Sequence, residues 1–265
     1  MTRIALLQMD LVFGRPEDNK QKAGKMIEEA TAQKAEIVVL PELWTTGYAL
    51  TKISELADPN GQAFQAFFSE QAKKYGITIV GGSIAERSTD DAVFNTSYTF
   101  SHTGERLNAY RKIHLFQLMD EHLYLHAGDQ VTTYDIHNVP ASTIICYDLR
   151  FPELTRTLAL SGVQMIFIPA EWPHPRLQHW RQLQIARAIE NQLFMISCNR
   201  VGKAGDTEFF GHSMVVDPWG EVLLECSEEE GVFVVDIDLS LVAEVRKKIP
   251  VFADRRPHLY TSAHF

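Results

Sequence analysis

The sequence predicts an α/β fold in which helices cover the faces of mixed β-sheets. Short, nearly continuous apolar runs recur along the chain, as is typical of strands covered on both faces. The segments between them place apolar residues at i, i+3, i+4 and i+7, the spacing of amphipathic helices. Between residues 95 and 136 the segments become shorter and more polar around the turn signal SHTGE, so an antiparallel section and a long loop are expected there.

The individual elements follow in chain order. Strands are predicted at 4–8, 37–40, 77–80, 143–146, 165–168 and 194–197. Helical spacing is found in 23–30, 64–75, 177–192 and 241–249. In the third of these helical segments, and just after it, Trp180, Leu183, Ile189 and Leu193 are expected in the core. Residues 212–225 predict a hairpin around Pro218, Trp219 and Gly220.

The bulk composition restricts the class of protein. The chain has 265 residues, 45% hydrophobic and 22% charged, which predicts one globular domain spanning residues 1–265. A net charge of −9 leaves no broad basic surface, so small molecules are expected as partners rather than nucleic acid or an anionic membrane. The apolar segments are too short for a membrane span or a secretory signal, which predicts a cytoplasmic location.

The three cysteines differ in their settings. They lack CxxC spacing, so neither a disulfide framework nor a zinc site is indicated. Cys198 and Cys226 lie in or beside apolar strands and are interpreted as structural thiols. Cys146 ends the apolar run STIIC before YDLRFPE, where a strand gives way to a helix, so its sulfur is expected to be exposed beside backbone N–H groups. An inert, packed cysteine is the alternative.

Two charged residues occupy similar positions at strand ends. Glu42 follows the buried run IVVL, and Lys112 lies in YRKIHLF between apolar neighbours. A buried carboxylate is unfavourable unless it is paired, so a pair between Glu42 and Lys112 is expected. A base and a cation would assist a thiol that is otherwise mostly protonated at neutral pH, with a pKa of ~8.5. A loop acid and a surface lysine are the plainer alternatives.

These motifs together resemble the nitrilase (carbon–nitrogen hydrolase) superfamily. IVVLPELWTTGY, YRKIHLF and STIICYDLRFPE occur in the order of its three signature segments, and NRVG, GHSMVVDPWGEVL and PVFADRRPHLY extend the likeness over the whole chain. The resemblance implies a four-layer α-β-β-α sandwich with two mixed sheets. It also implies a homodimer or larger assembly, in which the segment 250–265 packs on a partner subunit.

The resemblance also implies residue roles. Glu42 would be the general base, Lys112 the cation that stabilises the oxyanion, and Cys146 the nucleophile. The second glutamate of the family matches Glu121, eight residues before Asp129 of the Gly-Asp pair. The backbone N–H of Tyr147 is expected to complete the oxyanion site. No metal or cofactor is implied.

Among the branches, the chain is most similar to the omega-amidases, which hydrolyse the terminal amide of 2-oxoglutaramate and 2-oxosuccinamate. Arg150 and the PAEWPHPR loop, with Trp172 as an apolar wall, are the candidates for binding the substrate carboxylate. A pair of Arg150 with Asp148 or Glu153 is the structural alternative. N-carbamoyl amino acids, aliphatic amides and nitriles would use the same cysteine chemistry, so these substrates stay open.

Other classes of function have weaker signals. The segment 81–85, GGSIA, lacks the closing glycine of GxSxG, and the scattered His114, His122 and His126 do not form HExxH. No GxGxxG or GxxxxGK[ST] is present, so nucleotide binding is not indicated. A catalytically silent binding module on the same fold is the alternative from another class.

Overall fold

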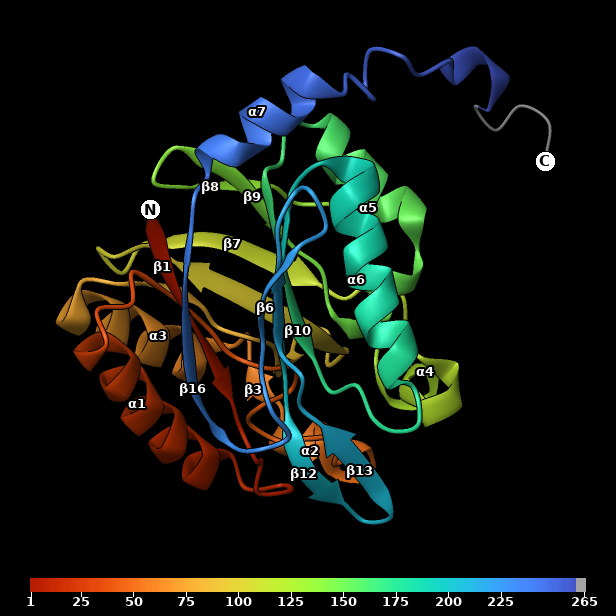
Figure 1. Cartoon of the computed structure of the whole chain (residues 1–265). Helices are drawn as coiled ribbons and strands as arrows, with labels where there is room; N and C mark the ends of the chain where they lie inside the picture. Colours follow the sequence, from red (N-terminus) through yellow and green to blue (C-terminus); the bar gives the residue numbers. More distant parts are fainter. Residues whose placement is uncertain (261–265) are drawn as a thin grey trace.

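The computed structural model of the chain describes residues 1–260, and in it two β-sheets stack face to face between helices (Figure 1). The helices are α1 (Pro16–Ala32), α2 (Ile53–Leu56), α3 (Gln62–Tyr75), α4 (Glu121–Tyr124), α5 (Pro152–Leu160), α6 (Leu177–Asn191) and α7 (Ser240–Lys248). Short 3-10 turns lie at Leu50–Lys52, Gln117–Met119, Cys146–Arg150 and Pro257–Leu259. The helices α1, α3, α6 and α7 lie in the regions where apolar spacing predicted helix.

The first sheet has the strand order β16-β1-β2-β4-β6-β5-β3, with β7 paired beside β6. Its strands are β1 (Thr2–Gln8), β2 (Ile37–Val39), β3 (Asp58–Pro59), β4 (Thr78–Val80), β5 (Ile84–Arg87), β6 (Val93–Phe100), β7 (Arg106–Arg111) and β16 (Gly231–Ile237). β1, β2 and β4 are mutually parallel, whereas β16, β6 and β7 join by antiparallel pairing. The sheet is therefore mixed, with the antiparallel hairpin β6–β7 around the SHTGE turn.

The second sheet has the order β15-β14-β11-β10-β9-β8. Its strands are β8 (Tyr134–Ile136), β9 (Val139–Thr143), β10 (Met165–Ala170), β11 (Phe194–Asn199), β14 (Met214–Val216) and β15 (Val222–Glu225), and β12 (Val201–Ala204) and β13 (Thr207–Phe210) form a separate hairpin. The central strands β9, β10 and β11 are parallel, and the outer pairs are antiparallel. Both sheets are thus mixed.

Three apolar clusters show the four layers. Alternating residues of β1 point to opposite faces of the sheet: Ala5 and Leu7 pack with α1 and α3, whereas Ile4 and Leu6 join a cluster with Phe167 and Ile196 of the second sheet. A third cluster joins the far face of the second sheet to α5 and α6. Helix, sheet, sheet and helix therefore follow one another, and the predicted α-β-β-α sandwich is confirmed by these layers.

Two local expectations were wrong. The strand predicted at 143–146 ends at Thr143, and Cys146 begins a 3-10 turn instead. The backbone turns there because the carboxylate of Asp148 accepts the Ile145 N–H at 2.9 Å. Ile189, expected in the core, is 51% exposed on the outer side of α6. Trp180 and Leu193 are buried as expected.

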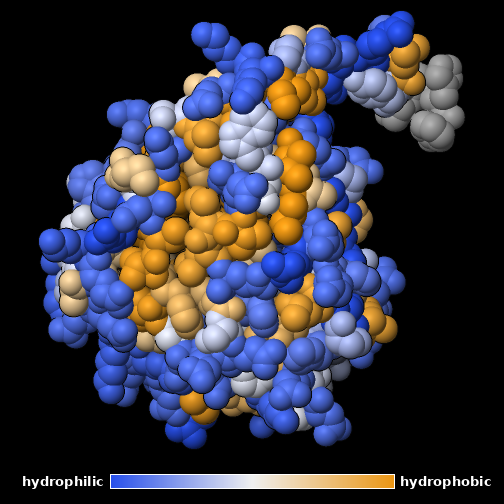
Figure 2. All heavy atoms as spheres, in the orientation of Figure 1, coloured by the Kyte–Doolittle hydropathy of each residue, from blue (hydrophilic) through white to orange (hydrophobic). Residues whose placement is uncertain are grey.

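One side of the molecule is apolar where the edge strands β15 and β16 lie, and Figure 2 shows hydrophobic side chains gathered in the middle of this view. The half-buried or exposed apolar residues of these strands are Val222, Leu223, Leu224, Val232, Phe233, Val234 and Val235. No helix among residues 1–260 is both long and apolar enough to cross a membrane.

Candidate active site

The site lies where strands of the two sheets end. Glu42 follows β2 of the first sheet, and Glu171 directly follows β10 of the second. The two segments touch, because the Glu171 N–H donates to Glu42 Oε2 at 2.8 Å. Gly82, with φ of +62°, lets the chain after β4 lie against Pro41, the residue before Glu42: a Cβ there would lie 2.1 Å from the carbonyl oxygen of Pro41. The sheet edges thus bring residues distant in sequence into one buried region.

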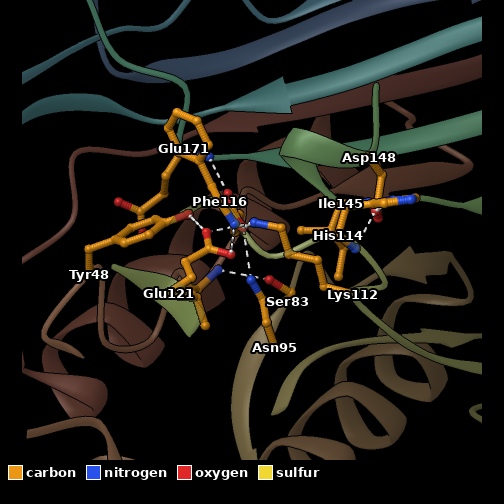
Figure 3. Close-up of polar contacts among 12 residues, drawn as sticks. Tyr48, Ser83, Asn95, Lys112, His114, Phe116, Glu121, Ile145, Asp148 and Glu171 are labelled. Atoms are coloured by element: carbon orange, nitrogen blue, oxygen red, sulfur yellow. Dashed lines mark hydrogen bonds and ion pairs between the residues drawn. The ribbon is translucent and has the colours of Figure 1, made fainter. Parts of the chain in front are cut away.

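Lys112 lies at the centre of this region and is fully buried. Its Nζ lies 2.8 Å from Glu42 Oε1 and 2.7 Å from Glu121 Oε1. Burial alone would lower the pKa of the Lys112 ammonium, but the charges of Glu121 and Glu42 outweigh it and hold that pKa well above its ordinary value. A permanent cation is therefore fixed between two carboxyl groups. Figure 3 shows Lys112 and Glu121 converging with Tyr48 and Asn95.

Glu42 and Glu121 are held by further donors. Asn95 Nδ2 donates to Glu42 Oε1 at 2.8 Å. The Tyr48 hydroxyl donates to Glu121 Oε1, and the Phe116 N–H donates to Glu121 Oε2 at 2.9 Å. Burial raises the pKa of Glu121, and the Lys112 ammonium opposes that rise. Each carboxyl group is thus oriented by three donors and cannot rotate freely.

Cys146 begins the 3-10 turn with a φ of +46°, a strained conformation for a residue with a side chain. Asp148 holds this turn, because its carboxylate also accepts the hydroxyl of Tyr110 at 2.7 Å and the N–H of His114 at 3.0 Å. The prediction that the Cys146 sulfur would be exposed was wrong, since this residue is only 5% exposed. The residue belongs to the apolar cluster that joins the second sheet to α5 and α6.

The environment of the thiol links it to the charged cluster. Burial raises the pKa of Cys146 well above its ordinary value, and the Glu42 carboxylate adds to that rise while Lys112 opposes it. The thiol is therefore protonated at neutral pH, with a base and a cation beside it. The structure thus brings together the four candidates Glu42, Lys112, Glu121 and Cys146. Within residues 1–260, the Tyr147 N–H meets no hydrogen-bond acceptor.

A small pocket opens beside Cys146. It is lined by Phe116, Cys146, Tyr147, Arg150, Glu171, Trp172, Pro173 and Arg176. The guanidinium of Arg150 lies 4.6 Å from the Trp172 ring centre and forms no salt bridge with Asp148 or Glu153. Its contact is His179 Nδ1 at 3.3 Å. Arg150 and Trp172, the two expected substrate-binding residues, therefore share one pocket with the thiol.

Several residues of the site were not identified from the sequence. Arg176 lies in the pocket, and its guanidinium is 5.6 Å from the Phe116 ring centre. Among the described residues, neither Arg150 nor Arg176 has a carboxylate within 4 Å. Arg176 and Glu171 both belong to the PAEWPHPR loop, which the sequence predicted as part of the carboxylate site without naming these two residues. Tyr48 and Asn95 carried no local signal, because only the fold brings them to the carboxylates.

The residues that suggested other functions have structural roles. Ser83 is buried, and its Oγ accepts the N–H of Leu43 at 2.9 Å, so it supports the chain beside Glu42. His114 bonds to Asp148 and stacks on Phe151, with ring centres 3.5 Å apart. No group of three or more His, Cys, Asp or Glu side chains suited to a metal ion occurs in the part of the chain described.

Comparisons with known proteins agree with this architecture. The family model described as carbon–nitrogen hydrolase matches residues 3–247. The chain is 50% identical over 257 residues to 2-oxoglutaramate amidase of Bacillus subtilis (strain 168), covering 97% of this chain and 98% of that protein. It is 37% identical over 269 residues to the omega-amidase NIT2 of Homo sapiens, covering 97% of this chain and 96% of that protein.

Solved structures give the same result for the fold. Saccharomyces cerevisiae Nit3, described as a member of branch 10 of the nitrilase superfamily, superposes with a TM-score of 0.90 at 30% identity, covering 96% of each chain. A double mutant of an amidase from Nesterenkonia sp. AN1, solved in complex with acrylamide, superposes with a TM-score of 0.87 at 26% identity. The match covers 98% of this chain and 95% of that one.

Proposed function

Because the chain belongs to the carbon–nitrogen hydrolase family, we propose that it hydrolyses the terminal amide of a small carboxylate-bearing substrate, such as 2-oxoglutaramate or 2-oxosuccinamate. The observation that carries this substrate class is the pair of arginines, Arg150 and Arg176, without carboxylate partners in the pocket beside Cys146. The names of the relatives from Bacillus subtilis and Homo sapiens support it. The products are a 2-oxo acid and ammonia.

The first stage forms a thioester. Glu42 takes the proton of the Cys146 thiol as the sulfur attacks the amide carbon, since a thiol with a raised pKa needs a base during the attack. The Lys112 ammonium and the Tyr147 N–H stabilise the oxyanion that forms on the carbonyl oxygen. Glu42 then gives the proton to the leaving nitrogen. The C–N bond breaks and ammonia departs.

The second stage hydrolyses the thioester. Glu42 takes a proton from a water molecule, whose oxygen attacks the thioester carbon. When the C–S bond breaks, that proton passes to the Cys146 sulfur and restores the thiol. Glu121 acts mainly through Lys112, because it binds the ammonium at 2.7 Å and keeps its charge directed at the reacting carbonyl. Every proton is returned, so no cofactor is required by this scheme.

The two arginines of the pocket are expected to favour an acidic substrate. Burial lowers the pKa of Arg150, with Arg176 adding a like charge, so the two guanidinium groups repel each other in the absence of an anion. A substrate carboxylate relieves that repulsion and can accept bidentate hydrogen bonds. Trp172 and Phe116 supply the apolar walls for the short carbon chain.

A substrate panel tests the proposal. Ammonia release is measured with 2-oxoglutaramate, 2-oxosuccinamate, an uncharged short amide, an N-carbamoyl amino acid and a nitrile, with Cys146→Ala as the blank. We expect the two omega-amides to give the highest kcat/KM. Arg150→Gln and Arg176→Gln should raise KM for the omega-amides, whereas Arg106→Gln, far from the pocket, should not. Equal rates with charged and uncharged amides would contradict the carboxylate pocket, and no turnover at all would support a silent binding module.

We propose that the chain forms one domain, residues 1–265, that assembles as a homodimer through its C-terminal segment. Figure 1 shows the chain after α7 leading away from the layered body. Leu259 and Tyr260 are 63% and 53% exposed there, which favours contact with a second copy. Residues 261–265 of the segment 250–265 lie outside the described residues. Sedimentation velocity should show a dimer that dissociates when 250–265 is removed, and a monomeric full chain would contradict the proposal.

The cytoplasm is the compartment we propose. All three cysteines are buried and free, which suits a reducing environment, where thiols persist. Cell fractionation should place the activity with the cytoplasmic markers. Recovery in the extracellular fraction would rule this location out.

A further inference from the structure

Glu171 is a buried carboxyl group that the two-stage scheme does not use. It is 1% exposed, directly follows β10 and lies in the wall of the pocket that holds Cys146. Its Oε2 accepts from Arg200 Nη1 at 3.1 Å. Its Oε1 is buried and has no hydrogen-bond partner among residues 1–260. An unpartnered polar atom at this depth is unfavourable unless a ligand completes it.

The charges around Glu171 indicate its protonation state. Three carboxyl groups, Glu42, Glu121 and Glu171, share the buried cluster with two cations, Lys112 and Arg200. One additional proton on a carboxyl group balances these five charges, and balance is strongly favoured where water is excluded. The remaining carboxylate near Arg200 is that of Asp10, 3.6 Å away, whose side chain is about half exposed.

The hydrogen bonds show which group holds that proton. Glu42 and Glu121 each accept three donors, which stabilises their ionised forms. Glu171 accepts one, so its ionised form is the least stabilised of the three. Burial raises the pKa of Glu171 to about 8, against the opposing charge of Arg200 and with the Glu42 carboxylate adding to the rise. The neutral group then carries its O–H on Oε1.

We propose that Glu171 is a substrate-binding residue, whose protonated Oε1 donates a hydrogen bond to the carboxylate-bearing end of the substrate beside Arg150 and Arg176. The inference rests on the proposed amidase function. A neutral acid contributes a donor without adding a negative charge that would repel the substrate. An ionised Glu171 would remove the donor and oppose the two arginines.

The proposal predicts a pH dependence of substrate binding. Charged or titratable groups surround Glu171 on every side: Arg200 after β11, Glu42 after β2, Lys112 after β7, Tyr48 in the loop after β2, and Cys146, Arg150 and Arg176 in the pocket. Below pH about 8 the carboxyl is neutral and the donor is present. As the pH rises through that value the donor is lost, so KM should increase while kcat changes less.

Two substitutions test this with 2-oxoglutaramate. Glu171→Gln keeps a donor that does not ionise in this range, so KM should stay near the wild-type value at pH ~7 and the alkaline increase should disappear. Glu171→Met removes the donor and should raise KM about tenfold at every pH, equivalent to about 1.4 kcal/mol. Glu153→Gln, an exposed acid on α5, is the matched control and should follow the wild type. Persistence of the alkaline increase in Glu171→Gln would overturn the proposal, and so would an unchanged KM in a folded Glu171→Met.

An infrared measurement separates this inference from the proposed function. The carbonyl band of a protonated buried carboxyl should be present in the wild type at pH ~7, fall by pH ~9, and be absent from Glu171→Gln. If the wild type hydrolyses no omega-amide, the proposed function fails and this band still reports the state of Glu171. Absence of a band that depends on Glu171 would overturn the inference, whatever the turnover.

Discussion

At the scale of single residues, the site combines a base, a cation and a thiol with unlike environments. Lys112 is fully buried and depends on Glu42 and Glu121 for its charge. Cys146 is also enclosed, so burial disfavours its thiolate. In the proposed mechanism this arrangement differs from a preformed thiolate and imidazolium pair, because the proton leaves the sulfur only as the sulfur attacks. The low exposure strengthens each electrostatic contact.

Replacement of the central cation should abolish most of the activity. In Lys112→Ala we expect kcat to fall by about 10²–10³-fold, since one oxyanion donor contributes about 2.7–4 kcal/mol. Steady-state ammonia release measures this effect. The variant also leaves two buried carboxylates without their cation, so its melting temperature should fall. Lys22→Ala, on the surface of α1, serves as the control. Near-normal turnover in a folded Lys112→Ala protein would contradict the proposed role.

The three thiols should differ in reactivity. Cys146 borders a pocket beside a carboxylate base, whereas Cys198 is packed between the sheets and Cys226 is 3% exposed. We therefore expect iodoacetamide to modify Cys146 first, as followed by peptide mass spectrometry over time. Prior incubation with substrate should slow that reaction. Equally slow modification of all three would favour an inert fold.

At the scale of elements, the 3-10 turn Cys146–Arg150 determines where the Cys146 thiol, the proposed nucleophile, lies. Its conformation depends on Asp148, whose carboxylate accepts from Ile145, Tyr110 and His114. These contacts join the turn to β7 and to the segment that follows Lys112. The same carboxylate therefore holds both the turn and the chain two residues after Lys112.

Loss of that carboxylate should disturb both stability and catalysis. Asp148→Ala leaves the Tyr110 hydroxyl and the Ile145 N–H without their acceptor, so the free energy of unfolding should fall by about 2–4 kcal/mol. Urea denaturation measures that change, and kcat should fall with KM less affected. Asp135→Ala, an exposed acid of β8, provides the comparison. Unchanged stability in Asp148→Ala would show that the turn is held by other contacts.

At the scale of the whole molecule, the interface between the two sheets determines the site. Glu42 comes from one sheet, whereas Cys146 and Glu171 come from the other, so their separation depends on how the sheets stack. Phe167 of β10 lies at the centre of that interface and is fully buried. Packing between the sheets is therefore a condition for catalysis as well as for stability.

A cavity in this interface should lower both the stability and the activity of the protein. Phe167→Ala is expected to lower the free energy of unfolding by about 3–5 kcal/mol, because no neighbouring side chain fills the space. Activity at a temperature where the variant is folded should also fall, since the strand ends can shift. Ile189→Ala, on an exposed position of α6, should change neither. An equal loss of stability and activity in Phe167→Ala and Ile189→Ala would argue against a special role of the interface.

The sequence alone determined the strand and helix pattern, the four family positions at Glu42, Lys112, Glu121 and Cys146, and the pocket residues Arg150 and Trp172, because periodicity and motifs are local properties of the chain. The tertiary structure decided which groups meet. Asn95 and Tyr48 have no local signal, and the proton proposed on Glu171 follows from the balance of five charges brought together from separate strands. Contacts between distant segments depend on sheet stacking, and hydrogen-bond satisfaction and buried charge can be assessed only after those contacts are known.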